Sequence, residues 1–276
     1  MHSLRPVFLA PARLVMGLLF LAPLLIVLVY SFLTRGAYGG QSLPLTVDSY
    51  VRLADPIYLG ITIRSFWIAG VSTAVCVLLG FPLALFIARS QRRRNLWLGL
   101  VMLQFWTSFL VRTYAWMFLL RDTGLVNTLL LSAGLTSEPL PLLYNDLAVI
   151  LGLVYGYLPF MVLPIYATLE RIDRSLLEAA ADLGANPVGT LTRVVIPLSK
   201  PGILAGAILV FIPCLGAYLT PDLLGGGKSI LMGNVVQNQF TNARDWPFGA
   251  ALSLAVMAVV MVLLLALGRG DRGGLL

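Results

Sequence analysis

The sequence predicts an all-α, polytopic membrane protein with six transmembrane helices. Hydrophobic residues make up 59% of the 276 residues and charged residues only 11%, and the mean hydropathy is +0.90. A soluble domain carries roughly 25% charged and about 45–50% apolar residues, so soluble fold classes are excluded. A helix needs about 20 mostly apolar residues to cross the bilayer, and six stretches of the chain supply them. One membrane domain, 1–276, accounts for the whole chain.

The expected spans follow one another along the chain. They are residues 14–33, 66–88, 96–120, 147–169, 202–219 and 248–267. Four of these spans contain prolines, namely Pro23, Pro82, Pro159, Pro164 and Pro213. A proline within a span frees a backbone carbonyl, which is tolerated where a neighbouring helix or a water-lined cavity satisfies it. The prolines therefore indicate either kinked helices around a pathway or simple packing kinks.

The first span and the segment after it are interpreted from length and composition. The first apolar run is too long for a typical signal peptide, and no Ala-x-Ala cleavage site follows it, so we expect a retained signal-anchor helix. The segment 34–65 is rich in glycine and proline. Such a composition is typical of loops and short interfacial helices.

The charge distribution orients the spans. With a cytoplasmic N-terminus, the inner segments hold 12 of the 19 basic residues but only 5 of the 12 acidic ones. The whole formal excess of +7 then falls on one face, as the positive-inside rule expects. The sequence thus predicts a bacterial inner-membrane protein with both termini in the cytoplasm. The run 92–94, Arg-Arg-Arg, is interpreted as a topology signal that also contacts anionic lipid headgroups.

Few residues could carry out chemistry. His2 is the single histidine, which excludes a histidine-based metal site or catalytic triad. Cys76 and Cys214 lie in apolar runs and are expected to pack rather than to form a disulfide. The run 225–229, Gly-Gly-Gly-Lys-Ser, lacks the upstream glycine of a phosphate-binding loop, since position 222 is Asp222. We therefore expect no enzyme, no bound cofactor or metal, and no nucleic-acid partner.

A polar island at 170–200 separates the fourth and fifth spans. Leu176, Leu177, Ala180 and Leu183 form an apolar face at helical spacing, with Glu178 and Asp182 on another face. Gly184 suits the left-handed residue that ends a helix, and Pro187 suits the first turn of the next one. The pattern predicts a short helix–turn–helix that lies in water, or else an ordinary cytoplasmic loop.

The island also resembles a known motif. Glu178-Ala179-Ala180, three residues, Gly184, nine residues, then Val194-x-Ile196-Pro197 is similar to the EAA loop of ABC-importer permeases. The resemblance implies a type I importer-like permease whose loop is the coupling helix that docks onto an ATPase. The coupling residues that it implies are Glu178, Ala179, Ala180, Asp182, Gly184, Pro187, Arg193 and Pro197. It further implies a second permease subunit, two ATPase subunits that hydrolyse ATP, and a periplasmic solute-binding protein.

The segment from Gly216 to Gly226 and the aromatic stretch from Trp106 to Trp116 resemble the spermidine/putrescine branch of these permeases. This resemblance implies a small cationic solute, most simply a polyamine. The residues expected along the path are Asp222, Tyr218, Tyr155, Tyr157, Trp106, Tyr114, Arg112 and Asp245. Aromatic faces and carboxylates suit a polyamine because they attract cations.

Several alternatives stay open. The aromatic residues can instead form an interfacial belt, and Arg112 can instead snorkel to the membrane surface. Related permeases carry opines, ferric iron or other solutes. An ion-driven secondary transporter is the rival of a different class, although it would be favoured by inverted repeats and acidic residues near the bilayer midplane, and neither is evident.

Overall fold

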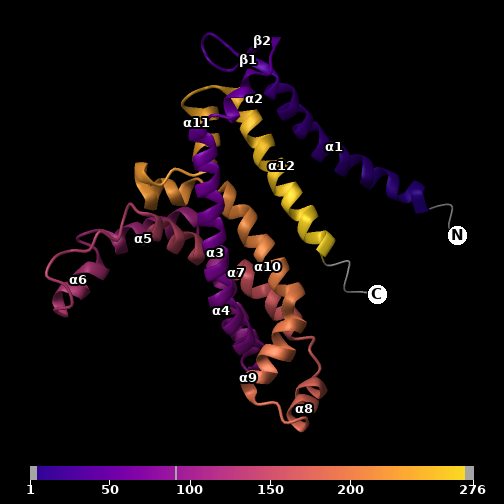
Figure 1. Cartoon of the computed structure of the whole chain (residues 1–276), viewed down its shortest axis with the longest axis vertical. Helices are drawn as coiled ribbons and strands as arrows, with labels where there is room; N and C mark the ends of the chain where they lie inside the picture. The colour runs from indigo at the N-terminus through magenta and orange to yellow at the C-terminus, as the bar shows by residue number, and fades with distance from the viewer. Residues whose placement is uncertain (1–4, 91, 271–276) are drawn as a thin grey trace. The chain divides into compact units, whose positions relative to one another are not determined.

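The computed structural model describes residues 5–90 and 92–270 (Figure 1). The described part is helical apart from one small two-stranded sheet. The contacts within the chain define two compact units, residues 1–60 with 235–276, and residues 61–234. The two units are described separately.

In the first unit, two long helices pack side by side. They are α1 (Arg5–Ser31) and α12 (Trp246–Gly270). After α1 the chain forms an antiparallel hairpin of β1 (Leu33–Arg35) and β2 (Gln41–Leu45), and then α2 (Asp48–Leu53), which packs on α12. The expected short helix is present in this segment, whereas the hairpin was not expected from the sequence.

An ion pair ties α2 to the start of α12. Arg52 Nη1 lies 2.8 Å from Asp245 Oδ2, and the guanidinium lies 4.0 Å from the centre of the Phe248 ring. Burial lowers the pKa of Arg52, but the hydrogen bond and charge of Asp245 outweigh it, so that the pKa lies above its ordinary value. The other carboxylate oxygen of Asp245 accepts the Phe248 N–H at 3.2 Å, so it caps α12.

The second unit is built around α7 (Asp146–Leu169), which supplies more of its buried side chains than any other helix. Helix α10 (Ile196–Gly216) packs along it. Gly202 and Gly206, one turn apart on α10, allow this close approach: a Cβ at Gly206 would lie 3.1 Å from the Met161 carbonyl oxygen, and one at Gly202 would lie 2.7 Å from that of Pro164. Small residues four apart are a common means of close helix packing in membranes.

The third expected span, 96–120, is wrong as a single helix. The chain instead forms α4 (Arg94–Leu103), a 3₁₀ turn at Gln104–Trp106, α5 (Phe109–Leu120) and α6 (Leu125–Ser132), with a bend of 92° at the break. Thr107 and Ser108 have extended ψ angles of 142° and 133°. The Thr107 hydroxyl donates to the Gln104 carbonyl at 3.0 Å, which offers the backbone an alternative to a helical hydrogen bond.

The other five spans correspond to helices that are long and apolar enough to cross a bilayer. Their bounds are Leu14–Ser31, Pro56–Arg89, Asp146–Leu169, Pro187–Gly216 and Trp246–Ala266. Counting the bent pair as one broken span gives up to six spans among the described residues. The largest differences in length are at α3 (Pro56–Arg89), which begins ten residues early, and at the fifth span, which begins at Pro187 rather than 202 and ends at Gly216 rather than 219.

Shorter elements complete the second unit. Helices α8 (Arg174–Asp182) and α9 (Pro187–Thr190) lie beyond the ends of α3 and α7 (Figure 1). A π-helical turn, η2 (Leu191–Val195), joins α9 to α10 without a break. After α10 come η3 (Pro221–Gly225), η4 (Gly226–Lys228) and the start of α11 (Met232–Thr241).

Candidate functional site

The island after α7 forms the helix–turn–helix that its sequence predicts. Asp173 caps α8 by accepting the Ser175 N–H at 3.0 Å, and this bond holds the pKa of the Asp173 carboxyl below its usual range. At the other end Gly184 has φ +80°, and the N–H groups of Gly184 and Ala185 donate to the carbonyls of Ala181 and Ala180. These bonds form a Schellman turn, which fixes where α8 ends.

The second helix begins as expected but continues further. Asn186 caps α9 by accepting the Gly189 N–H at 2.7 Å, and Pro187 occupies its first turn. We expected a short helix, whereas α9, η2 and α10 form one continuous helical segment from Pro187 to Gly216. Pro197 lies in the first turn of α10. Movement of the island would therefore be transmitted directly to the fifth span.

Most of the predicted coupling residues are exposed. They are Glu178, Ala179, Asp182, Gly184, Pro187, Arg193 and Pro197, whereas Ala180 is buried. The predicted apolar face of α8 is only partly packed, since Leu183 is 89% exposed. Val188 on α9 is 67% exposed. Exposed apolar side chains among carboxylates are typical of a protein-docking surface.

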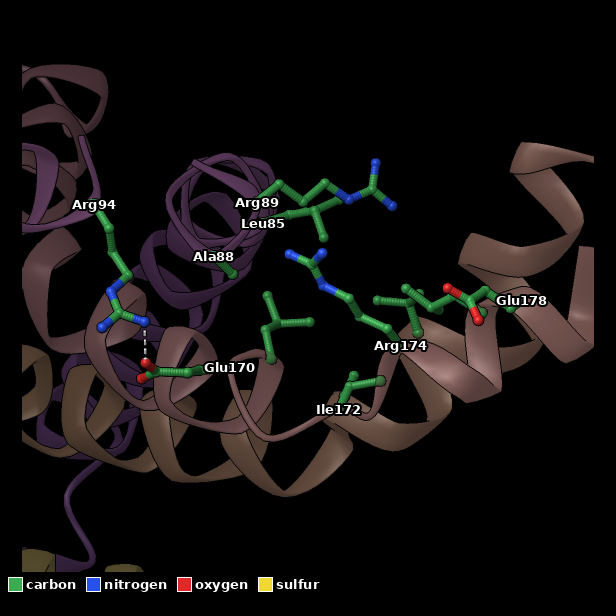
Figure 2. Close-up of a pocket in the computed structure, with 11 residues that line it drawn as sticks. Leu85, Ala88, Arg89, Arg94, Glu170, Ile172, Arg174 and Glu178 are labelled. Carbon is green, nitrogen blue, oxygen red and sulfur yellow. Dashed lines mark hydrogen bonds and ion pairs between the residues drawn. The ribbon is translucent and has the colours of Figure 1, made fainter. Parts of the chain in front are cut away.

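A cavity of about 610 Å³ lies between α8 and the ends of the spans (Figure 2). Its walls come from the ends of α3 and α7, the start of α4, α8 and η2. An ion pair between Arg94 and Glu170 joins the start of α4 to the residue after α7. Arg174 extends from α8 toward the end of α3, where Leu85 and Arg89 lie (Figure 2). The Arg94–Glu170 pair is thus a polar contact between the island and the start of the third span, and the cavity separates α8 from the ends of α3 and α7.

Two of the predicted path aromatics, Tyr155 and Tyr157 on α7, contact aromatic rings of α5. Tyr155 contacts Trp116 edge-to-face, with ring centres 5.4 Å apart, and Tyr157 lies 6.4 Å from Phe109. Tyr114 is 38% exposed. Trp106, at the break after α4, is 90% exposed and outside this cluster. The break in the third span is what directs α5 toward α7, and hydropathy does not reveal it.

Arg112 on α5 has an unusual environment. Its Nε and Nη1 atoms are buried and have no hydrogen-bond partner in the part of the chain that the structure describes. The guanidinium lies 5.6 Å from the centre of the Phe109 ring, at the edge of the aromatic cluster. A side chain that snorkels places its charged group in water. The burial of two nitrogens favours the other interpretation, in which Arg112 faces protein.

The carboxylates of the expected path have different environments. Asp222 is exposed on η3, and its N–H donates to the Tyr218 carbonyl at 3.0 Å. Tyr218 is 47% exposed. Asp245 is 3% exposed and paired with Arg52 in the first unit, which gives it a structural role instead. Asp222 and Tyr218 therefore stay candidates for the path because both are exposed. The carboxylate of Asp245 is buried and already paired, so it is not available to a solute.

One polar cluster was not foreseen. Arg64 on α3 donates to Asp146 at the start of α7 at 2.7 Å, and the Ser229 hydroxyl bonds the same carboxylate. Ser229 belongs to the Gly-Gly-Gly-Lys-Ser run, and η3 rather than a strand precedes that run. The serine therefore has a structural partner. No local sequence signal connects Arg64 to Asp146, since 82 residues separate them.

The described residues contain no group of three or more His, Cys, Asp or Glu side chains that could hold a metal ion. The absence of a cofactor stays an expectation from the sequence. The second unit is a set of packed helices with the exposed hairpin of α8 and α9 at one end. It offers surfaces and aromatic clusters rather than a set of reactive groups.

Comparison with known families decides the class. Residues 77–269 match the family of binding-protein-dependent transport system inner membrane components, and this match covers the bent pair, the island and α12. The chain belongs to this permease family. The expected all-α, type I importer-like fold and the recognition as an ABC-importer permease are thereby confirmed. The permease is a transport component rather than an enzyme, and a multi-pass protein of the inner membrane.

Individual relatives cover almost the whole permease. The spermidine/putrescine transport system permease protein PotB of Escherichia coli is 43% identical over 251 residues, which cover 91% of each chain. A bacterial ABC transporter that imports the acidic polysaccharide alginate has the same fold, with a TM-score of 0.77 at 18% identity over 100% of this chain and 99% of that one. A second structure of an alginate transporter, in complex with its pentasaccharide-bound periplasmic protein, gives a TM-score of 0.70 at 20% identity over 95% and 94%.

Proposed function

We propose that this permease is a membrane-spanning subunit of an ATP-driven importer of polyamines such as spermidine and putrescine. The observation that carries the proposal is the 43% identity, over 91% of both chains, to a permease named for those two solutes. The local chemistry agrees with a cationic solute. The exposed carboxylate of Asp222 and the half-exposed rings of Tyr155 and Tyr218 can attract a cation without enclosing it.

The proposed path begins at Asp222 and Tyr218 and continues along the cluster of Tyr155, Tyr157, Phe109 and Trp116. Cation–π contacts each contribute about 0.5–2 kcal/mol, so several in succession bind a polyamine without trapping it. Arg112 borders this cluster with two unsatisfied nitrogens. We assign its missing partner to the second permease subunit, because a buried unpaired charge is costly. Trp106 and Tyr114 are assigned to the exposed rim of the cluster.

Coupling to ATP is assigned to the hairpin of α8 and α9. ATP hydrolysis belongs to two separate ATPase subunits, whose dimer contacts one such hairpin from each of two permease subunits. Glu178, Asp182, Leu183 and Val188 are exposed there and provide both charge and apolar area. A ligand-driven change requires a differential fit to two states. Closing of the ATPase dimer would shift α9, and the unbroken helix from Pro187 would move the fifth span with it.

Sidedness follows from the charge excess. We place both termini, the run 92–94 and the α8–α9 hairpin in the cytoplasm, and we place the β1–β2 hairpin and the segment around Lys228 in the periplasm. A periplasmic binding protein delivers the solute to that outer face. The alginate transporter whose structure includes its periplasmic protein supports the same arrangement for this permease.

The test is a screen with the reconstituted complex. The ATPase rate is measured with binding protein alone and with binding protein loaded with spermidine, putrescine, an opine or ferric iron. Stimulation by the two polyamines and not by the opine or iron is expected. Stimulation by the opine or iron alone would replace the polyamine assignment but keep the permease class. Transport that requires an ion gradient and no ATP would favour the secondary transporter.

A further inference from the structure

Helix α4 is one leaflet long and is poorly covered by the rest of the chain. Its ten residues rise about 15 Å, which is about half of the roughly 30 Å hydrocarbon thickness. None of its residues is buried, and Leu96 and Leu100 are 57% and 51% exposed. The chain then bends at the break after Trp106. The length of α4 therefore matches the length of an acyl chain within one leaflet, and such a chain can lie along the helix.

An apolar cavity of about 270 Å³ runs beside this helix. Seven of its eight lining residues are apolar, and they come from α3, α4 and α7: Leu83, Trp97, Leu100, Val101, Leu158, Pro159 and Val162. The eighth, Gln104, uses its amide to bond the Tyr155 carbonyl. Trp97 packs edge-to-face on Phe86, with ring centres 5.3 Å apart, near the end of α3. Apart from Gln104 and the indole N–H of Trp97 the lining is apolar, so the cavity suits a hydrocarbon chain better than water.

A basic cluster lies at the open end of this helix. Arg92 and Arg93 are exposed and precede α4 directly, and neither side chain has a hydrogen bond or ion pair among the described residues. Arg94 is already paired with Glu170. Two unused guanidinium groups at the membrane surface, above an apolar cavity, match the two parts of an anionic phospholipid.

We propose that the second unit binds an anionic phospholipid of the inner leaflet at this place. The phosphate pairs with Arg92 and Arg93, and one acyl chain fills the cavity between α3, α4 and α7. The lipid thereby braces the broken third span, whose α4 half has little protein cover. The inference requires only that the run 92–94 lies at the membrane surface, and it does not depend on which solute is carried.

The test is native mass spectrometry of the purified transporter complex, titrated with phosphatidylglycerol or with phosphatidylcholine of the same acyl chains. Each arginine near an anionic surface contributes a factor of about five in affinity. Arg92→Gln with Arg93→Gln should therefore weaken phosphatidylglycerol binding by about 25-fold and leave phosphatidylcholine binding unchanged. Lys200→Gln, an exposed cation at the start of α10, is the matched control and should have no effect.

Two further arms separate the alternatives. Val101→Phe fills the cavity without changing charge and should weaken phosphatidylglycerol binding, while glycerol 3-phosphate should not compete. Competition by glycerol 3-phosphate at equal strength would identify a soluble phosphate ligand instead. Equal retention of both lipids, or unchanged binding by the arginine variant, would overturn the proposal. Binding that is lost when the second permease subunit joins would assign the cavity to that subunit. The mass of each intact complex shows whether the variant has assembled.

Discussion

Arg94 and Glu170 form an ion pair that joins the start of α4 to the first residue after α7. The pair lies on the wall of the cavity beneath α8, so it connects the broken third span to the hairpin that we assign to the ATPase (Figure 2). Both side chains are about half exposed, at 44% and 42%. Such a pair contributes only about 0.2–1 kcal/mol to stability. Its expected role is to keep two moving segments in register.

Reversing one charge of this pair should impair transport more than folding. In Arg94→Glu, two carboxylates would face each other, and we expect solute uptake to fall several-fold while the melting temperature of the complex changes little. The double variant R94E/E170R restores an ion pair of opposite direction and should recover most of the uptake. The double-mutant cycle measures the coupling. Uptake in the double variant no better than in Arg94→Glu would show that the pair has no role in coupling.

The turn at Gly184 permits a test in which strain is separated from steric clash. A Cβ at this position would meet no atom within 4 Å, but φ is +80°. Gly184→Val should therefore cost roughly 1–2 kcal/mol in backbone strain and abolish transport through a displaced hairpin. Gly184→Asn is the matched control, because asparagine tolerates the left-handed region, and it should retain transport.

The readout for Gly184 is solute-stimulated ATPase activity of complexes that have assembled normally. Glu178→Lys, which reverses a charge on the exposed face of α8, should also lose stimulation. Wild-type stimulation in an assembled Gly184→Val complex would mean that the shape of this turn does not control coupling.

Asp222 and Asp245 should respond in opposite ways. Asp222→Asn removes an exposed carboxylate, so polyamine uptake should fall. The free energy of unfolding should stay within about 0.5 kcal/mol of the wild-type value. Asp245→Ala removes the partner of Arg52 and the cap of α12, and should destabilise the protein by about 1–3 kcal/mol. Thermal unfolding and labelled spermidine uptake are measured for both. Unchanged uptake by Asp222→Asn would exclude Asp222 from the path.

Sidedness can be tested with single added cysteines. Asn95 and Gly227 are both exposed, and a Cβ at Gly227 would meet open space, so cysteine fits at each. Cys76 and Cys214 are buried and should give a low background. An impermeant thiol reagent added to whole cells with a permeable outer membrane should label Gly227→Cys only. Labelling of both positions from outside would contradict the proposed topology.

The local backbone features of the hairpin could be predicted from the sequence because they depend on neighbouring residues. Gly184 and Pro187 each have a conformational preference that fixes a helix end, and the structure shows both in those roles. The break at Thr107 could not be predicted in this way. Hydropathy averages over a window, and the residues on both sides of the break are equally apolar.

Contacts between segments that are distant in the sequence could not be predicted from it either. Arg94 and Glu170 are 76 residues apart, and Arg64 and Asp146 are 82 apart. The first pair forms because α4 begins beside the end of α7, and the second because the start of α7 lies beside the body of α3. One sequence carries no signal of either placement. The same limit applies to Asp245, which was predicted as a path carboxylate with no sign that it pairs with the distant Arg52.

The most direct test of the proposed function is accumulation of radiolabelled spermidine in proteoliposomes that contain the whole complex. Uptake should require both the loaded binding protein and hydrolysable ATP, should be competed by unlabelled putrescine, and should be lost in Gly184→Val but kept in Gly184→Asn. Spermidine uptake that is absent under all these conditions, or that proceeds equally with a non-hydrolysable ATP analogue, would contradict an ATP-driven polyamine importer.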